Sequence, residues 1–352
     1  MTTKRTLIPT LALALAAVCI AGALAAKPPV KRKPPVKKPP AASGIQPAMP
    51  MPGQWAELNK PYYLGQDKYI VFTLKSCAFS CDRLYFGDEI VTAGGQEKLL
   101  ILKFSLQNPK KEEWTVNWAT VHFTAVDSQD NNREGTDYVG QDINKQKLDM
   151  RLKPAQKVEC YTCIKLPNDC QAPKLIVKPS DDGPVLRYDL HGKVKGLDAP
   201  FADPNDTTGA TALADVPAEK GKLFPGINFD FTFDGIAFVG GTYGDSEPNE
   251  GYGWAVVSAT MKNMAKEKQS INWATLIPKP KGKSGYLNFS DGVFASADGE
   301  GNFSTEMEPG DMIGVQYAFP VRKGAELNSF SLQETDEGRR YVWDLGAVKA
   351  EF

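Results

Sequence analysis

The feature that most constrains this sequence is a pentapeptide that occurs twice. VNWAT occupies Val116–Thr120, and INWAT occupies Ile271–Thr275, an offset of 155 positions. The same offset aligns Asn108 with Asn263. Further pairs at this offset are Pro154 with Pro309 and Asp189 with Asp344. Self-similarity at a fixed offset predicts that one domain is present twice, as a tandem pair rather than a solenoid.

The offset changes at one place in the chain. FTLKSCAFSC at Phe72–Cys81 aligns with FTFDGIAFVG at Phe231–Gly240, at an offset of 159. The difference of four residues must therefore lie between Asp82 and Leu99. We interpret it as a loop that is longer in the first copy.

Apolar residues recur with a period of two in both copies. The aligned sets include Leu100, Leu102, Phe104 and Leu106 with Ala255, Val257, Ala259 and Met261. Such alternation is typical of half-buried strands. Both copies change phase after Leu74 and Phe233, which predicts a bulge or tight turn at Lys75-Ser76 and at Asp234-Gly235. Short strands broken by Gly, Pro, Asn and Asp predict an all-β chain of two β-sandwiches.

The aligned copies set the domain limits. We expect the first sandwich at 55–195, a linker at 196–222 and the second sandwich at 223–352. The linker has small and polar residues without a period, so the two domains need not be rigidly docked. We interpret Trp118 and Trp273 as core aromatics that anchor each sandwich, and not as residues that stack on a ligand.

The N-terminus has the layout of a secretory signal peptide. A cationic start precedes the mostly apolar stretch Leu7–Ala21, and residues 23–25 carry the small side chains of an export cleavage site. We expect a signal peptide at 1–26, with a retained membrane anchor as the alternative. No later apolar run approaches the ~18 residues of a spanning helix. We therefore expect no transmembrane span in the mature chain and a secreted or periplasmic location, with association with the envelope as a further expectation.

A basic, proline-rich segment follows at 27–54. It contains KPPVK twice, and Lys27–Pro52 holds six Lys or Arg and no Asp or Glu. Proline lacks the N–H and restricts φ, so this segment is expected to be an extended stalk. Its charge suggests an anionic envelope polymer as a partner, while the alternative is a spacer that lysine keeps in solution.

At this point the residues resemble a known family. SLQNPKKEEWTVNWATVHFTAVDSQDN, LKPAQKVECYTCIKLP and KLIVKPSDDGPVLRYDL are similar to bacterial extracellular immunoglobulin-like domains of uncharacterised function. These domains share the sandwich of a mycobacterial secreted immunoprotective antigen. The resemblance covers most of the first copy and, more weakly, the second. It implies an exported β-sandwich and no catalytic residues, and this chain departs from it in its cysteines and stalk.

Five cysteines remain after the signal peptide, all in the first copy: Cys77, Cys81, Cys160, Cys163 and Cys170. In an oxidising compartment we expect two disulfides and one spare thiol. Strand alternation directs Cys160 inward and Cys163 outward. The candidate pairs are Cys77 with Cys160 and Cys163 with Cys170. The alternatives are a zinc site built from CxxC and CxxxC, or a spare thiol that links two chains.

No catalytic motif is present. The chain lacks HExxH, P-loop, GxGxxG and GxSxG patterns, and its two histidines, His122 and His191, lie in or beside expected strands. We expect no catalytic residue, cofactor, metal ligand or specific nucleic-acid partner. The best hypothesis is a non-catalytic binding or structural module of the envelope, whose protein or glycan partner the sequence does not name. The alternatives are a metal- or redox-linked protein and an accessory region of an envelope enzyme.

Overall fold

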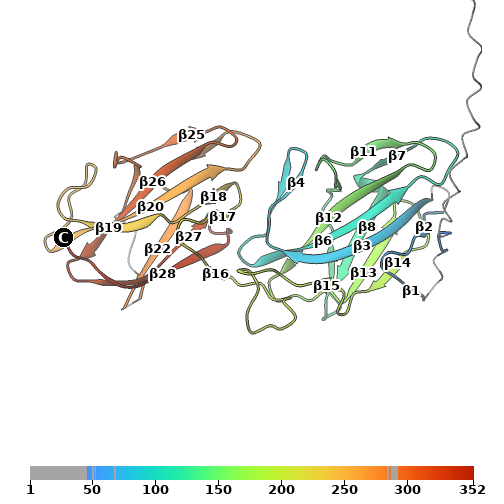
Figure 1. Ribbon diagram of the computed structural model, residues 1–352, viewed down its shortest axis with the longest axis horizontal. Coiled ribbons are helices and arrows are strands. Elements are labelled where there is room, and N and C mark those ends of the chain that lie inside the picture. Colours follow the sequence, from blue (N-terminus) through green and yellow to red (C-terminus); the bar gives the residue numbers. More distant parts are fainter. Residues whose placement is uncertain (1–45, 50, 52, 67–68, 284, 287–291) are drawn as a thin grey trace, which may run out of the picture. The chain divides into compact units, whose positions relative to one another are not determined.

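The computed structural model describes residues 46–49, 51, 53–66, 69–283, 285–286 and 292–352. This part of the chain consists of β-strands and loops with one short 3-10 helix, η1 (Trp118–Thr120), and forms two sandwiches (Figure 1). The prediction of an all-β chain is confirmed. The signal peptide and most of the basic stalk lie outside the described residues. No helix in the described part is long and apolar enough to cross a membrane.

Sandwich 1, residues 55–195, has two sheets and two short strand pairs. The first sheet, in spatial order, consists of β1 (Trp55–Ala56), β14 (Leu186–Asp189), β13 (Lys174–Pro179), β8 (Val121–Val126) and β9 (Asn132–Glu134). The second consists of β10 (Gly140–Gln141), β12 (Lys157–Pro167), β6 (Glu97–Gln107), β3 (Ile70–Ser80) and β15 (Val194–Lys195), with β2 (Tyr62–Leu64) also paired to β3. The short pairs are β7 (Trp114–Asn117) with β11 (Asp149–Leu152), and β4 (Leu84–Phe86) with β5 (Glu89–Val91).

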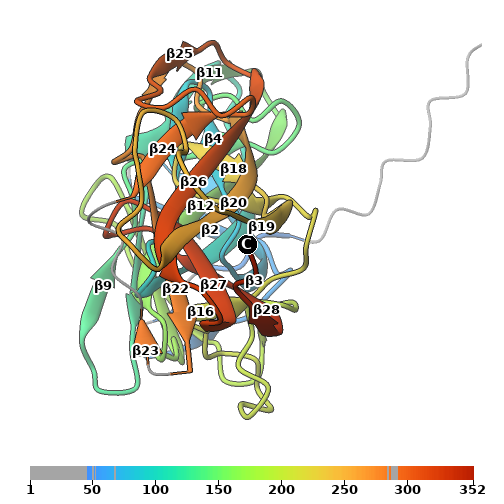
Figure 2. The ribbon, with the colours of Figure 1, turned by 90° about the vertical axis from the view of Figure 1, so that its left-hand side faces the viewer.

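Sandwich 2, residues 215–352, repeats this plan. Its first sheet consists of β16 (Asp215–Pro217), β28 (Arg340–Lys349), β27 (Glu326–Glu334), β22 (Leu276–Gly282) and β23 (Gly285–Tyr286). Its second consists of β17 (Phe224–Pro225), β18 (Phe229–Phe231), β20 (Tyr252–Asn263), β26 (Met312–Arg322) and β24 (Val293–Ser296), with β19 (Gly235–Val239) also paired to β20. The short pair is β21 (Gln269–Ile271) with β25 (Thr305–Met307). Figure 2 shows the long β20–β26 ladder of this sandwich.

The offset that aligns the two sequences also aligns their hydrogen-bonded ladders. Leu106 pairs with Val158 in sandwich 1, and Met261 pairs with Ile313 in sandwich 2. In each sandwich the first strand runs parallel to a strand near the end of the domain, as β1 does with β14 and β16 with β28. The two halves therefore share topology and register, as the period-two patterns predict.

A buried asparagine forms the same bonds in both halves. The Nδ2 atom of Asn108 donates to the carbonyl oxygens of Glu112 at 2.7 Å and Leu152 at 2.9 Å. Asn263, 155 positions later, forms the equivalent bonds to Glu267 at 3.0 Å and Met307 at 2.9 Å. Because each amide bonds to one carbonyl of the following loop and to one of a distant strand, it holds the loop after the central strand in place.

Aromatic side chains from the two sheets of sandwich 1 meet in its core. The ring of Phe104 on β6 lies 5.4 Å from that of Phe72 on β3 and 5.0 Å from that of Phe123 on β8. In sandwich 2 a different set of rings meets in the core, with Phe233 5.7 Å from Phe330 and 5.6 Å from Trp343. Tilted rings at these separations bury large apolar areas, which makes these clusters main stabilisers of each sandwich.

The predicted change of phase is confirmed in both halves. In sandwich 1 the register of β3 against β6 shifts between Leu74 and Ser76, which is a bulge inside a continuous strand. In sandwich 2 the corresponding strand is interrupted: β18 ends at Phe231 and β19 begins at Gly235. An extra residue on one strand reverses which side chains face the core, and this explains the transfer of the inward role from Leu74 to Cys77.

Much of the segment at 196–222 packs on the sandwiches. Ala210 and Ala212 are buried in the core of sandwich 1. Val216, at the centre of β16, is buried in the core of sandwich 2. The segment expected as a linker therefore supplies the first strand of sandwich 2 and covers one end of sandwich 1.

Candidate functional site at the junction of the two sandwiches

Two glycine-containing turns meet where the sandwiches join. The amide of Gly95, in the loop between β5 and β6, donates to the carbonyl of Glu337 in the turn between β27 and β28, at 2.7 Å. A Cβ atom on Gly95 would lie 2.7 Å from the carbonyl oxygen of Gly338, and one on Gly94 would lie 3.0 Å from that of Glu337. Only glycine lets the two backbones approach this closely.

The guanidinium of Arg339 is buried beside these turns. Its donors bond to the carbonyl oxygens of Leu213, Gly94 and Glu97, the Gly94 contact being 3.1 Å. It also donates to Oδ1 of Asn168 at 3.3 Å. Arg339 thus connects the start of β28 to the linker and to two loops of sandwich 1. A planar cation with five donors suits several carbonyls at once, which a lysine does not.

A buried ion pair forms a second connection. Nη1 of Arg83 lies 2.8 Å from Oδ1 of Asp230, and the same guanidinium donates to the carbonyl oxygens of Gly226 at 2.9 Å and Ile227 at 3.2 Å. Arg83 precedes β4, and its partners lie in the loop before β18 and on that strand. Charge-assisted bonds of this kind are strong when they are desolvated and fully paired.

The carboxylate of Glu334 organises that same loop from the side of sandwich 2. It accepts hydrogen bonds from the backbone amides of Ile227 at 2.7 Å, Asn228 at 2.9 Å and Phe229 at 3.1 Å. Burial raises the pKa of Glu334, whereas the three amides and the nearby Arg83 act in the opposite direction. A buried acid therefore binds three successive amides of the segment that receives Arg83.

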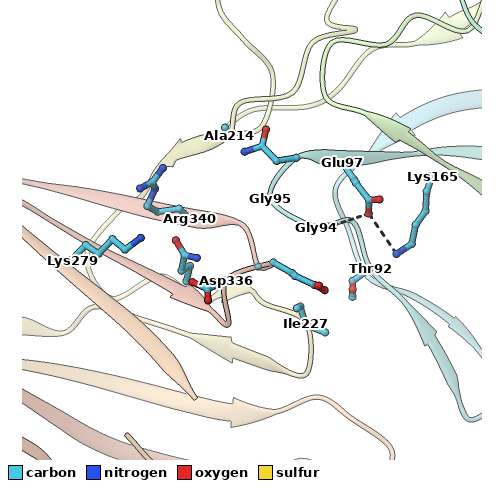
Figure 3. A pocket seen from close by; sticks show the side chains of 14 residues that line it. Thr92, Gly94, Gly95, Glu97, Lys165, Ala214, Ile227, Lys279, Asp336 and Arg340 are labelled. Carbon is cyan, nitrogen blue, oxygen red and sulfur yellow. Dashed lines mark hydrogen bonds and ion pairs between the residues drawn. The ribbon is translucent and has the colours of Figure 1, made fainter. Parts of the chain in front are cut away.

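These contacts border a cleft of about 740 Å³ (Figure 3). Its wall from sandwich 1 includes Glu97 and Lys165, whose Oε2 and Nζ atoms are 3.5 Å apart. Its wall from sandwich 2 includes Lys279, Gln333, Asp336, Glu337 and Arg340, and Ala214 of the linker completes it. Nε of Arg340 is 2.6 Å from Oδ1 of Asp215.

The lining determines what the cleft can hold. Three cationic and three anionic side chains face it, together with the backbone of Gly94, Gly95 and Gly338, while Ile227 and Ala214 are the apolar contributions. Lys279 forms no ion pair with the described residues. The lining contains neither His nor Cys. This arrangement suits a polar ligand that carries both donors and charges.

Sequence reasoning missed this site, although one signal pointed to it. The four-residue difference between the copies lies between Asp82 and Leu99, and this longer loop contains Arg83, Gly94 and Gly95. An insertion that one copy alone carries can make contacts that the other copy does not. Arg339 and Glu334 gave no signal, because a single charged residue in a strand pattern is usually on the solvent face.

The five cysteines lie away from the cleft and are buried free thiols. Cys77, Cys81, Cys160 and Cys170 belong to the main core of sandwich 1, whereas Cys163 is on the opposite face of β12, under the β4–β5 pair. The predicted opposite directions of Cys160 and Cys163 are thus confirmed, although Cys163 is covered. Burial raises the pKa of Cys77 to about 12 and that of Cys163 to about 11.

The strand register gives the separation of Cys77 and Cys160, the two cysteines of the first candidate disulfide. Cys77 on β3 pairs with Leu102, and Cys160 on β12 pairs with Phe104, so β6 lies between the two cysteines. Two strand spacings amount to roughly 10 Å, whereas a disulfide joins Cα atoms about 4.4–6.8 Å apart. Cys163 and Cys170 belong to different clusters. In the described residues, no group of three or more His, Cys, Asp or Glu side chains is arranged to hold a metal ion.

The two tryptophans of the repeated pentapeptide are exposed, so their interpretation as core residues is wrong. Trp118 is 46% exposed and Trp273 is 72% exposed. Each follows the end of a strand, in a turn where alternation no longer predicts direction. The buried positions belong to Val116 before the turn and Thr120 at its end. Each indole forgoes part of the roughly 1.5–3 kcal/mol that burial of a large apolar side chain contributes.

The chain matches no protein-family model, and no curated protein matches it. Among solved structures it is similar to an uncharacterised β-sandwich protein from Clostridium difficile 630, with 13% identity, a TM-score of 0.29, and coverage of 43% of this chain and 99% of that one. A hypothetical protein from Bacillus anthracis shows 15% identity, a TM-score of 0.24, and coverage of 34% of this chain and 91% of that one. Likenesses this weak say nothing about activity.

Proposed function

We propose that this chain is an exported, non-catalytic binding module of the bacterial envelope, in which two copies of one immunoglobulin-like sandwich act as a unit. The observation that carries the proposal is the junction cleft. Both sandwiches and the linker contribute to its wall, and Gly95, Arg83 and Arg339 join the sandwiches beside it. A site shared by two domains gives the duplication a use, because neither copy forms the cleft alone.

The ligand that fits this cleft is polar and carries both charges. Lys279 is available for an anionic group, and Asp336 and Glu337 lie close enough in the wall to receive a cationic one. Short peptides and peptide-bearing sugars of the cell wall have this character. The basic stalk at 27–54 would bring the module to an anionic envelope polymer by charge attraction.

Binding to the cleft is tested with muropeptides and short zwitterionic peptides as probes, by calorimetry on the mature chain. We expect Lys279→Ala to weaken binding about tenfold, since a charge-assisted bond is worth roughly 1.5–3 kcal/mol. Lys178→Ala is the matched control, because Lys178 is exposed on β13 outside the cleft. Equal affinity of the Lys279 variant and the wild type would place any ligand elsewhere.

Envelope association is tested by fractionation of the host, comparing the mature chain with a version that lacks 27–51. We expect the intact chain to sediment with the envelope at low salt and to be released by salt, because exposed charges are screened over about 10 Å at 0.1 M. The shortened version should remain unbound. If both versions fractionate alike, the stalk is only a spacer.

A further inference from the structure

The two Asn-Trp-Ala-Thr turns, at 117–120 and 272–275, do not line the junction cleft, and each carries an exposed tryptophan. We propose that each turn is a carbohydrate-binding platform, on which Trp118 or Trp273 stacks against one pyranose ring of a β-1,4-linked polysaccharide. This proposal rests on the view of the chain as a binding module, but not on the cleft.

The hydrogen bonds of the turn account for its asparagine and threonine. In the first copy, the amide of Ala119 donates to Oδ1 of Asn117 at 3.1 Å, and the amide of Asn117 donates to Oγ1 of Thr120 at 2.9 Å. In the second copy the equivalent bonds, Ala274 to Asn272 and Asn272 to Thr275, both measure 2.9 Å. This reciprocal capping makes each turn rigid.

The tryptophan has no such role in either copy. Its side chain is neither buried nor needed for the capping bonds, yet the same residue stands at 118 and at 273. The same large aromatic side chain is therefore at least 46% exposed at the equivalent position of both sandwiches, which makes it a candidate contact residue in each. Because the turn is rigid, the indole is presented to a ligand with little loss of backbone entropy on binding.

The group beside each indole is polar. Nδ2 of Asn117 and of Asn272 donates no hydrogen bond to the described residues, since the capping bonds use only Oδ1 and the backbone. Each turn therefore combines an aromatic face with a neighbouring amide donor. A pyranose with equatorial hydroxyls has the complementary surface, with apolar C–H bonds on its faces and hydroxyl acceptors at its edge.

The duplication points to a polymer. A ligand that repeats along its length can occupy two equal sites on one chain, which raises the overall affinity without any new kind of contact. A lipid surface requires a wider apolar face than one indole with polar neighbours. A protein partner requires a well-packed patch of about 800 Å² around the anchor residue.

The test is co-sedimentation of the mature chain with insoluble chitin, cellulose and peptidoglycan sacculi, with anionic phospholipid vesicles as the competing surface. We expect binding to at least one polysaccharide. Trp118→Ala and Trp273→Ala should each weaken it about tenfold, and the double variant by about 100-fold or more. Trp118→Phe with Trp273→Phe should retain part of the affinity, since a smaller aromatic ring remains.

The matched control is Trp55→Ala, because Trp55 on β1 is 48% exposed but does not belong to the repeated turn. It should bind like the wild type. Chitin and cellulose carry no peptide charges for the junction cleft to recognise, so a loss of binding to them in the tryptophan variants separates this site from the cleft. Circular dichroism confirms that each variant is folded. The proposal is overturned if the wild type binds none of the three polysaccharides, if the double variant sediments like the wild type, or if the chain binds only the vesicles.

Discussion

Arg83 in sandwich 1 and Asp230 in sandwich 2 form an ion pair of 2.8 Å, and their side chains are only 5% and 19% exposed. The guanidinium uses its remaining donors on carbonyl oxygens of the same loop. Because both charges are largely removed from water, the loss of either partner would leave the other as an unpaired buried charge. Buried polar contacts therefore take part in joining the two sandwiches.

Replacement of Arg83 by alanine should uncouple the sandwiches. The change leaves Asp230 and two carbonyl oxygens without a donor, so we expect a loss of about 3–5 kcal/mol in the free energy of unfolding. Differential scanning calorimetry should show the unfolding transition broaden or split. Arg187→Ala, at an exposed position of β14, is the control. An unchanged transition would show that the pair does not hold the sandwiches together.

Gly95→Ala should disturb the junction by a different route. The new methyl group would lie 2.7 Å from the carbonyl oxygen of Gly338, so one of the two turns has to move. Overpacking of this kind costs about 1–3 kcal/mol. The measurement is the midpoint of thermal unfolding, with Gly240→Ala as the matched control because its Cβ would meet Phe352 at an ordinary 3.4 Å. Equal shifts for the two variants would contradict a close backbone contact at the junction.

Lys98 should make stability depend on pH in the alkaline range. Its amine is buried and donates to the carbonyl oxygens of Asn168, at 2.7 Å, and Ala210. Burial lowers the pKa of Lys98 to about 8, from an ordinary 10.5. Between these values the unfolded chain binds more protons, so the contribution of Lys98 to stability rises with pH across that window, on the order of 3 kcal/mol.

The measurement for Lys98 is chemical denaturation at pH 7 and at pH 10, for the wild type and for Lys98→Met. Other groups titrate in both proteins, so the difference between the two slopes isolates the lysine. We expect the methionine variant to lack the alkaline gain. Parallel pH profiles would mean that the amine is as easily charged in the folded chain as in the unfolded one.

The thiols should be unreactive until the chain unfolds. Burial raises the pKa of Cys77 to about 12 and that of Cys163 to about 11, and only the thiolate is nucleophilic. At pH 8 we expect no rapid alkylation of the folded mature chain, and five reactive thiols in guanidinium. Their contribution to stability is complete below pH 9 and is lost as the pH rises through about 11 to 12. A single reactive thiol in the unfolded chain would instead indicate two disulfides.

The strand patterns and the equivalence of the two halves followed from the sequence because alternation is local. A side chain at Leu102 or Val257 faces the core whenever its strand pairs in register, and this needs no knowledge of distant residues. The bulge after Leu74 was predictable for the same reason. Alternation ends with the strand, however, and the direction of Trp118 was therefore predicted wrongly.

By itself the sequence determined that this is an all-β chain whose two halves share a register, because period two and turn residues act over a few positions. Only the tertiary structure decided that the halves meet through Gly95, Arg83 and Arg339, and that the five cysteines of the first half are buried thiols. Those outcomes depend on backbone carbonyls brought together from segments more than a hundred residues apart, as in the bonds of Arg83 and Arg339. Every residue has a backbone carbonyl, so residue identities do not show which carbonyls will meet a given side chain. Only the folded chain determines that.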